Sequence, residues 1–391
     1  MPQLLPFAGL RPDPAVVGPL DSFVCPPYDV ISQAQRHELI ARSPYNVVRL
    51  ELPDGDYGGA SKLLVHWRAT GALARETAPS LYGYRMTYPE PGGGPRATTG
   101  VIGALVLEPP GKGILPHEQT TSKAKTDRLE LIRALHANTS PIWCLCTGAG
   151  LIDALGSERS ARVARAVDDD GNLHEIWPIT ATSAHAEVGV AVGAAPLLIA
   201  DGHHRYETAL AYQAEQPAGA QGPDAVLAFV VALSEERLQV RAIHRVVSGL
   251  PAGASVLAAF ERDFELEASP AAGEDLLAQM VDEHALAVLT LAGTWLARAR
   301  PGTPSASFEL DSSRVDSVLS TLPRYQLDYE PDAGRAASEV RAGAATGAVL
   351  CRPATVAQIA ATARGGARMP PKTTLFWPKP RTGMVLRDWS G

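Results

Sequence analysis

The chain has 391 residues, of which 46% are hydrophobic and 20% are charged, and its formal net charge is −7 at pH 7. This length is sufficient for two or three domains, and an acidic balance without a basic block disfavours a nucleic-acid partner. Apolar runs such as 225–233 are too short to span a bilayer, and residues 1–7 do not resemble a signal peptide. We therefore expect a cytoplasmic protein with no membrane partner.

The numbers and positions of the cysteines and lysines indicate which kinds of site the protein can contain. Four cysteines are scattered along the chain without a CxxC pair, which predicts neither a disulfide framework nor structural zinc. Only six of the 35 basic residues are lysines. Because arginine is the usual cation of this chain, a lysine retained in a motif suggests a need for a compact ammonium charge.

The first region mixes helical and strand patterns. The periodicity predicts a helix over 32–41 with Ser32 as its N-cap, a strand over 46–52, a helix over 60–74, and a hairpin of strands over 81–88 and 98–107. Before the first of these helices, two prolines force an extended backbone, so that Tyr28 and Asp29 follow in a turn. These two side chains either bind a ligand or satisfy backbone groups in a buried turn.

A segment rich in charged side chains follows at 114–138. His117 and Glu118 end an extended stretch, and Lys123 and Lys125 belong to a hydroxyl- and lysine-rich loop ahead of a predicted helix. A glutamate beside a histidine and two lysines could act as a general base in a site that binds anions. The alternative is an exposed charged loop with a helix cap.

The most informative stretch is PLLIADGHHRYETAL, residues 196–210. An apolar strand leads into a turn, and helical spacing resumes at Tyr206. Gly202 lets a phosphate approach the backbone at a helix start, and Asp201 is of the type that binds magnesium. The next three residues, His203, His204 and Arg205, can donate to phosphate oxygens. The alternative is a helix capped by Asp201 beside a solvated basic turn.

The C-terminal part ends in a proline-rich segment, MPPKTTLFWPKPRTGMV. Lys372 and Lys379 flank Phe376 and Trp377 in what we predict to be a stiff loop. This loop could close over an anionic or nucleotide ligand, with one aromatic ring stacked on a base. The alternative is a tail strapped to the core through its aromatic side chains.

The chain divides by its patterns into three regions. We expect an N-terminal α/β region over 1–110, a core over 111–250 and a C-terminal α/β region over 251–391. Residues 148–185 resemble an insertion into the core, with an arginine-rich helix near 157–166 and an acidic hairpin turn. Residues 251–323 show no chemistry and are predicted to form a packing or oligomerisation layer.

Four stretches together resemble one known family. They are CPPYDVIS at 25–32, LPHEQTTSKAKTDRLELI at 115–132, ADGHHRYETAL at 200–210 and MPPKTTLFWPKPRTGMV at 369–385. On these stretches the full-length chain is identified as a member of domain-of-unknown-function family 1015. That name implies no activity.

A narrower resemblance implies an activity. PHE followed later by DGHHR is similar to the paired motifs of the ParB/sulfiredoxin-like superfamily, and especially of its free-serine kinases. The resemblance implies an α/β protein with a mixed sheet, in which a ParB/sulfiredoxin-like core is elaborated at both ends. In those kinases the glutamate of the first motif is the base towards the serine hydroxyl, and the second motif binds nucleotide phosphates and magnesium.

Carried over by position, the resemblance gives each candidate residue a role. Glu118 is then the catalytic base, and Asp201 serves the metal or the substrate. The phosphate-binding set is Gly202, His203, His204, Arg205, Lys123, Lys125, Lys372 and Lys379. The substrate-binding set is His117, Tyr28 and Asp29.

We therefore expect a magnesium-dependent phosphotransferase that uses ATP or ADP to convert a small hydroxyl compound, foremost free L-serine, to its phosphate ester. A nucleotide and a small-molecule substrate are the expected partners, and the sequence is compatible with a homodimer. Two alternatives stay open: a nucleotide-binding regulatory protein without turnover, and a phosphoester hydrolase in which His203 or His204 acts more directly.

Overall fold

The computed structural model describes residues 1–89, 94–109, 111–116, 122–156, 163–217, 219–220, 222–234, 238–301, 310–365 and 369–390, without the side chains of 122–125 and 363–364. The chain forms two compact units. The first unit comprises residues 1–116, 120–238 and 378–391, and the second comprises 117–119 and 239–377. None of the helices in the described part has the length and hydropathy that a membrane span requires.

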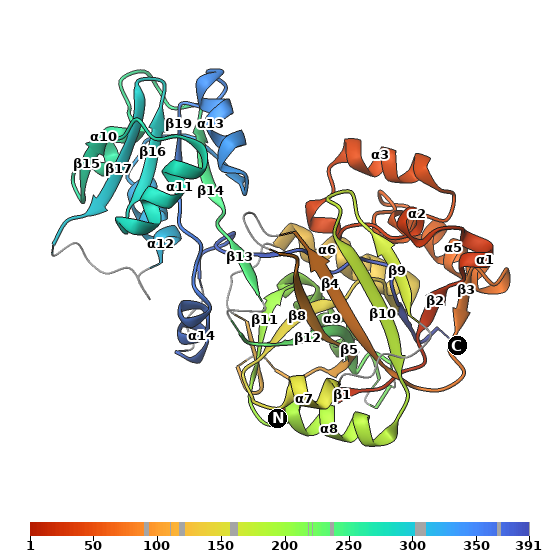
Figure 1. Ribbon diagram of the computed structural model, residues 1–391. Coiled ribbons are helices and arrows are strands. Elements are labelled where there is room, and N and C mark those ends of the chain that lie inside the picture. Colours follow the sequence, from red (N-terminus) through yellow and green to blue (C-terminus); the bar gives the residue numbers. More distant parts are fainter. Residues whose placement is uncertain are drawn as a thin grey trace. The chain divides into compact units, whose positions relative to one another are not determined.

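The first unit is built on a mixed sheet, which has nine strands among the described residues (Figure 1). In spatial order they are β6 (Ile114–Pro116), β11 (Leu197–Asp201), β8 (Ile142–Cys146), β12 (Ala225–Ala232), β5 (Arg96–Val106), β4 (Leu81–Tyr88), β10 (Leu173–Ile179) and β9 (Ala164–Val167), and β1 (Leu4–Leu5) also pairs with β5. The β11–β6 and β12–β8 pairs are parallel and the others antiparallel. The predicted α/β class with a mixed sheet is confirmed.

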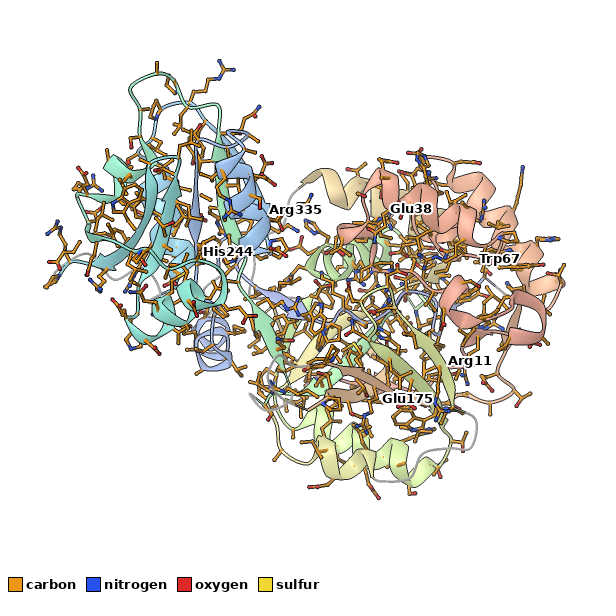
Figure 2. All side chains as sticks on the ribbon, turned by 45° about the horizontal axis from the view of Figure 1, so that its top comes forward. Arg11, Glu38, Trp67, Glu175, His244 and Arg335 are labelled. Atoms are coloured by element: carbon orange, nitrogen blue, oxygen red, sulfur yellow. The ribbon has the colours of Figure 1, made fainter. Side chains whose placement is uncertain are left out.

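Helices and short strands complete this unit. They are α1 (Pro14–Val17), α2 (Leu20–Phe23), η1 (Tyr28–Val30), α3 (Gln33–Arg42), α4 (Val48–Glu51), α5 (Tyr57–Ala69), α6 (Ser122–Leu135), α7 (Leu151–Leu155), α8 (Thr182–Gly193), α9 (His203–Ala214), and the paired strands β2 (Leu10–Pro12) with β3 (Leu73–Arg75) and β7 (Ala137–Asn138) with β21 (Arg387–Asp388). The main core packs strands of the sheet against α7, α8 and α9. Trp67 of α5, labelled in Figure 2, is buried against the rings of Phe23 and Tyr45.

Two local predictions are wrong. Residues 48–51, inside the predicted strand over 46–52, form helix α4, because Asn46 is buried and its side chain bonds the backbone of Ser22 at 2.8 Å and of Val48 at 3.0 Å. Lys123 and Lys125 lie on α6, which begins at Ser122, and not in a loop. The segment 148–185, predicted as an insertion, supplies β9 and β10 to the large sheet, where β10 pairs with β4 over its whole length.

The second unit contains a six-stranded antiparallel sheet. Its order is β15 (Phe264–Ala268), β17 (Gly293–Ala299), β16 (Leu286–Thr290), β19 (Gly347–Leu350), β14 (His244–Ser248) and β18 (Gln326–Glu330). One face packs against α10 (Val256–Phe260) and α12 (Asp311–Leu319), and the other against α11 (Gly273–Asp282) and α13 (Ala333–Arg341). Helix α14 (Val356–Arg364) and the pair β13 (Gln239–Arg241) and β20 (Leu375–Trp377) complete the unit.

The observed units group the chain differently from the three expected regions. Strands from 1–110 and from 111–250 share one sheet, so these two regions form a single body. The step from the first unit to the second falls at residue 239, near the expected boundary at 251. After the second unit, residues 378–391 return to the first. We call residues 378–388 the strap.

Candidate functional site

The DGHHR turn joins β11 to α9. Asp201 is the last residue of β11, and α9 starts at His203. Gly202 between them has φ +90°, a left-handed backbone that other residues adopt at a cost. A Cβ atom at Gly202 would also lie 2.9 Å from Cγ2 of Ile142. Both the backbone conformation and the lack of space for a Cβ atom therefore require glycine here. No side chain caps the N-terminus of α9 with a hydrogen bond.

Four charged side chains meet at this turn, and we call them the Asp201 cluster: Asp29, Asp201, Arg205 and Lys379. Oδ1 of Asp201 lies 2.5 Å from Nζ of Lys379, and its Oδ2 accepts from Nη2 of Arg205 at 2.7 Å. The ammonium of Lys379 also contacts Oδ2 of Asp29 at 2.9 Å. The residues come from η1, β11, α9 and the strap, so the fold joins segments that are far apart in sequence.

The charges in the cluster determine its protonation. Burial by itself would lower the pKa of Lys379, but the charges of Asp201 and Asp29 outweigh it and raise that pKa above its ordinary value. Burial raises the pKa of Tyr28 to about 12, with Arg205 opposing and Asp29 adding to the shift. The cluster thus presents an ammonium and a guanidinium facing the side chains of Asp29 and Asp201, beside a neutral phenol.

A buried hydrogen-bond chain holds the strap that carries Lys379. The backbone N–H of Arg381 donates to the Tyr84 hydroxyl at 3.0 Å. The Asp168 carboxylate accepts from Nε2 of His174 at 3.0 Å, which leaves Nδ1 of the neutral ring to accept from the Tyr84 hydroxyl at 2.8 Å. Burial lowers the pKa of His174, which favours the neutral ring that this chain requires. Tyr84 is separated from His174 by 90 positions in the sequence and from Arg381 by 297. No sequence spacing could therefore reveal these hydrogen bonds.

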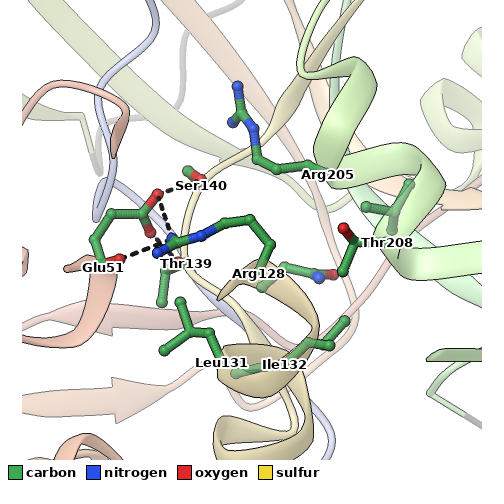
Figure 3. A pocket seen from close by; sticks show the side chains of 11 residues that line it. Glu51, Arg128, Leu131, Ile132, Thr139, Ser140, Arg205 and Thr208 are labelled. Carbon is green, nitrogen blue, oxygen red and sulfur yellow. Dashed lines mark hydrogen bonds and ion pairs between the residues drawn. The ribbon is translucent and has the colours of Figure 1, made fainter. Parts of the chain in front are cut away.

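A cavity of about 50 Å³ lies beside the cluster and shares Arg205 with it (Figure 3). Its wall contains Arg128 of α6, whose Nη1 donates to the Glu51 carbonyl at 2.8 Å and whose guanidinium lies 4.3 Å from the centre of the Tyr28 ring. The Glu51 carboxylate accepts hydrogen bonds from the hydroxyls of Thr139 and Ser140.

Two buried polar atoms beside this cavity have no hydrogen-bond partner in the described structure. They are Nε of Arg205 and Oγ1 of Thr208, which lie one turn apart on α9. A buried polar group without a partner costs free energy, roughly 1–3 kcal/mol. The cavity is large enough for a few water molecules, so a small polar molecule could satisfy both atoms.

The other predicted site residues are placed as follows. His117 and Glu118 lie outside the described residues, as do the side chains of Lys123 and Lys125. His203 is buried and His204 is half-buried in the first turn of α9. Sequence reasoning missed Arg128, Tyr84 and His174, each of which has a bonding partner more than 70 residues away in the chain.

The rest of the lysine and aromatic loop belongs to the second unit. Lys372 is exposed, and its carbonyl accepts from Arg245 at 2.8 Å. Phe376 is buried in β20, which pairs with β13, and the Trp377 ring lies 3.7 Å from the guanidinium of Arg241. These aromatic side chains pack within the unit.

Comparisons with known proteins place the chain in a family. Residues 4–322 match the model of a family described as a protein of unknown function, DUF1015. The chain belongs to this family. The match includes three of the four stretches that carry the resemblance, and the fourth lies beyond it. A comparison with curated proteins found no match.

Comparison with solved structures found distant similarities. The chain is similar to a free serine kinase variant in complex with AMP, at 13% identity and TM-score 0.39, covering 68% of this chain and 84% of that one. It is also similar to a hypothetical protein from Pyrococcus furiosus, at 14% identity and TM-score 0.37, over 68% and 88% of the two chains. The chain is also similar to SbnI from Staphylococcus aureus with a C-terminal truncation, at 12% sequence identity and TM-score 0.39, covering 72% of this chain and 85% of that one. Likenesses this distant do not identify an activity.

Proposed function

We propose that this member of the DUF1015 family is a magnesium-dependent phosphotransferase that uses ATP or ADP to phosphorylate free L-serine. The observation that supports it best is the Asp201 cluster at the start of α9. Its two cations are bonded to carboxylate side chains that an incoming phosphate can replace as partners. Phosphoryl transfer requires chiefly such positioning and charge neutralisation.

The turn supplies the parts that a nucleotide phosphate needs. The first N–H groups and the positive end of the dipole of α9 favour an anion, and Gly202 leaves the approach open. Arg205 and Lys379 provide charge at the same place. His203 and His204 on the first turn of α9 are the remaining proposed donors to phosphate.

Magnesium fits the same residues. Magnesium is commonly bound by one or two carboxylates, with nucleotide phosphates and water as further ligands. The carboxylates of Asp29 and Asp201 converge on one point, which the ammonium of Lys379 occupies. The described residues contain no group of three His, Cys, Asp or Glu that could bind a metal. In this proposal, nucleotide phosphates and water complete the ligand set. When bound, the ion neutralises charge on the transferring phosphate.

The cavity beside Arg205 is the proposed place for the acceptor. Free serine is small and polar, and its groups would satisfy the unpartnered Nε of Arg205 and Oγ1 of Thr208. In the transfer, a bond forms between serine Oγ and the terminal phosphorus as the bond to the leaving nucleotide breaks. Glu118 takes the hydroxyl proton in this scheme, a role that rests on its motif.

The test is phosphorus NMR on purified protein with magnesium, ATP or ADP, and a mixture of free amino acids and small polyols. We expect a new phosphomonoester signal that disappears when serine is left out. Nucleotide binding without a new signal would favour a regulatory protein, and steady nucleotide loss without an acceptor would favour a hydrolase. Either result contradicts the proposal.

A further inference from the structure

The second unit contains a cavity of about 650 Å³ that the proposed function does not use. It is lined by the turn after α11, the first turn of α12, the segment between β19 and α14, and Thr373. Ligand pockets in proteins typically have about 300–1,000 Å³. The cavity thus has the size of a small-molecule site.

A fixed ion pair forms one wall of this cavity. Nε and Nη2 of Arg352 donate to the two carboxylate oxygens of Asp311 at 2.9 and 2.7 Å, and the Arg352 backbone N–H donates to the same carboxylate at 2.9 Å. Asp311 is buried and its charge is neutralised by this two-pronged contact. The carboxylate therefore does not repel an anion in the cavity as a lone aspartate would.

His284 lies at the rim in a backbone conformation that favours glycine. It follows the end of α11 with φ +51°, where helices usually end in glycine. A histidine here is strained by roughly 1 kcal/mol relative to glycine. Its imidazole contacts Nη1 of Arg352 at 3.2 Å, so the strained residue adds a polar group to the cavity wall.

Arg314 contributes to the cavity wall a buried hydrogen-bond donor without a partner in the described structure. It lies on α12 one turn after Asp311, and its buried Nε has no hydrogen-bond partner in the described structure. With Asp311 neutralised by Arg352, the guanidinium of Arg314 leaves the lining with a net positive charge. Nearby hydroxyls of Ser312 and Thr373, 2.9 Å apart, and apolar side chains such as Leu310 complete the wall.

We propose that this cavity is a second ligand site, which binds a small molecule carrying an oxyanion, either a carboxylate or a phosphate. The oxyanion accepts from the guanidinium of Arg314, and the apolar wall covers the body of the molecule. This site goes beyond the proposed kinase function and does not depend on it, because its residues all belong to the second unit.

The experiment is hydrogen–deuterium exchange on the full chain with inorganic phosphate or with acetate, each against sodium chloride at equal ionic strength. We expect slower exchange in peptides covering 310–316 and 351–358. Protection by phosphate alone or by acetate alone identifies which oxyanion is preferred. The variant Arg314→Gln should need roughly 10- to 100-fold more anion for the same protection.

Two further variants keep the test decisive. Arg324→Gln makes the same charge change at an exposed arginine of the second unit outside the cavity lining, and should keep full protection. Ala354→Met narrows the cavity without changing its charge, and should lose protection. The proposal is overturned if neither anion protects these peptides, or if Arg314→Gln and Arg324→Gln respond alike.

Discussion

A long cation in each unit is largely or fully removed from solvent, and the two are bonded in different ways. Arg245 on β14 of the second unit is fully buried, and its Nη1 donates to the carbonyls of Ile243 and Lys372 at 2.9 and 2.8 Å. Its Nε also bonds the Asp316 carboxylate at 3.1 Å. Lys379 of the first unit bonds the side chains of Asp29 and Asp201.

The different bonding partners distinguish Arg245, a structural cation, from Lys379, a cation of the candidate site. Backbone carbonyls cannot move away or change charge, so Arg245 is a fixed part of the core of its unit. Carboxylate partners can bind a metal or be exchanged for phosphate oxygens, so Lys379 can change partners when a ligand arrives. Burial of a cation alone would not distinguish the two. The following predictions test this comparison.

The largest expected effect is on turnover in the first unit. Glu118→Gln should lower turnover by about 100- to 10,000-fold, because the amide cannot accept the hydroxyl proton. Nucleotide binding should be nearly unchanged in a titration. The control is Glu187→Gln on the exposed surface of α8, which should keep full activity. Unchanged turnover in Glu118→Gln would remove the proposed base and leave the first unit without assigned chemistry.

Arg245→Met should destabilise the second unit by about 3–5 kcal/mol, because it leaves Asp316 and two carbonyls without their buried donor. Urea unfolding measures the change. The exposed pair of Arg262 with Asp263 provides the control, since Arg262→Met should leave the unfolding midpoint where it is. If Arg245→Met weakened nucleotide binding as well, the contrast between the two cations would fail.

His244, next to Arg245 and labelled in Figure 2, should make the second unit sensitive to acid. Burial, and then the charge of Arg245, lower its pKa to about 4, while Asp332 opposes the shift. The stabilisation is therefore complete above the unfolded pKa of about 6.5 and is lost as the pH falls to about 4, a loss of about 3 kcal/mol.

The matched variant for this effect is His244→Asn. Nδ1 of His244 accepts the backbone N–H of Cys351 at 3.2 Å, and an asparagine oxygen can accept in its place without titrating. Unfolding of the full chain at pH 7, 5 and 4 should show a steeper loss for the wild type than for the variant. Parallel curves would mean that another group causes the acid sensitivity.

Lys379→Met should have the smallest effect of the four predictions. We expect the nucleotide affinity to be about 10- to 30-fold weaker at neutral pH, because a charge-assisted contact to phosphate is lost. Lys379→Arg keeps the charge and should recover part of the affinity. Calorimetric titration with ADP measures both. An unchanged affinity in Lys379→Met would show that the strap lysine is as structural as Arg245.

The sequence predictions were correct where the deciding interactions lie within a few residues, and wrong where contacts with distant segments decide the structure. The strand, the glycine turn and the helix at 197–214 were predictable because their signals lie within a few residues. So was the N-cap of α3, where Ser32 accepts from Gln35 at 3.2 Å. The alternating pattern over 46–52 was misleading, because the buried contacts of Asn46 with a segment 24 residues away decide for a helix.

The sequence by itself indicated the DUF1015 family through the resemblance of four motif stretches. It also determined the α/β class and the local shape of the DGHHR turn, because these depend on periodicity and backbone preferences. Only the tertiary structure decided that Lys379 meets Asp201 and Asp29, which lie 178 and 350 residues away. It also decided that Tyr84 and His174 hold the strap, and that Arg314 faces a cavity. Charges and hydrogen bonds act over a few ångströms, and the distance between two residues in space is set by the packing of the whole chain.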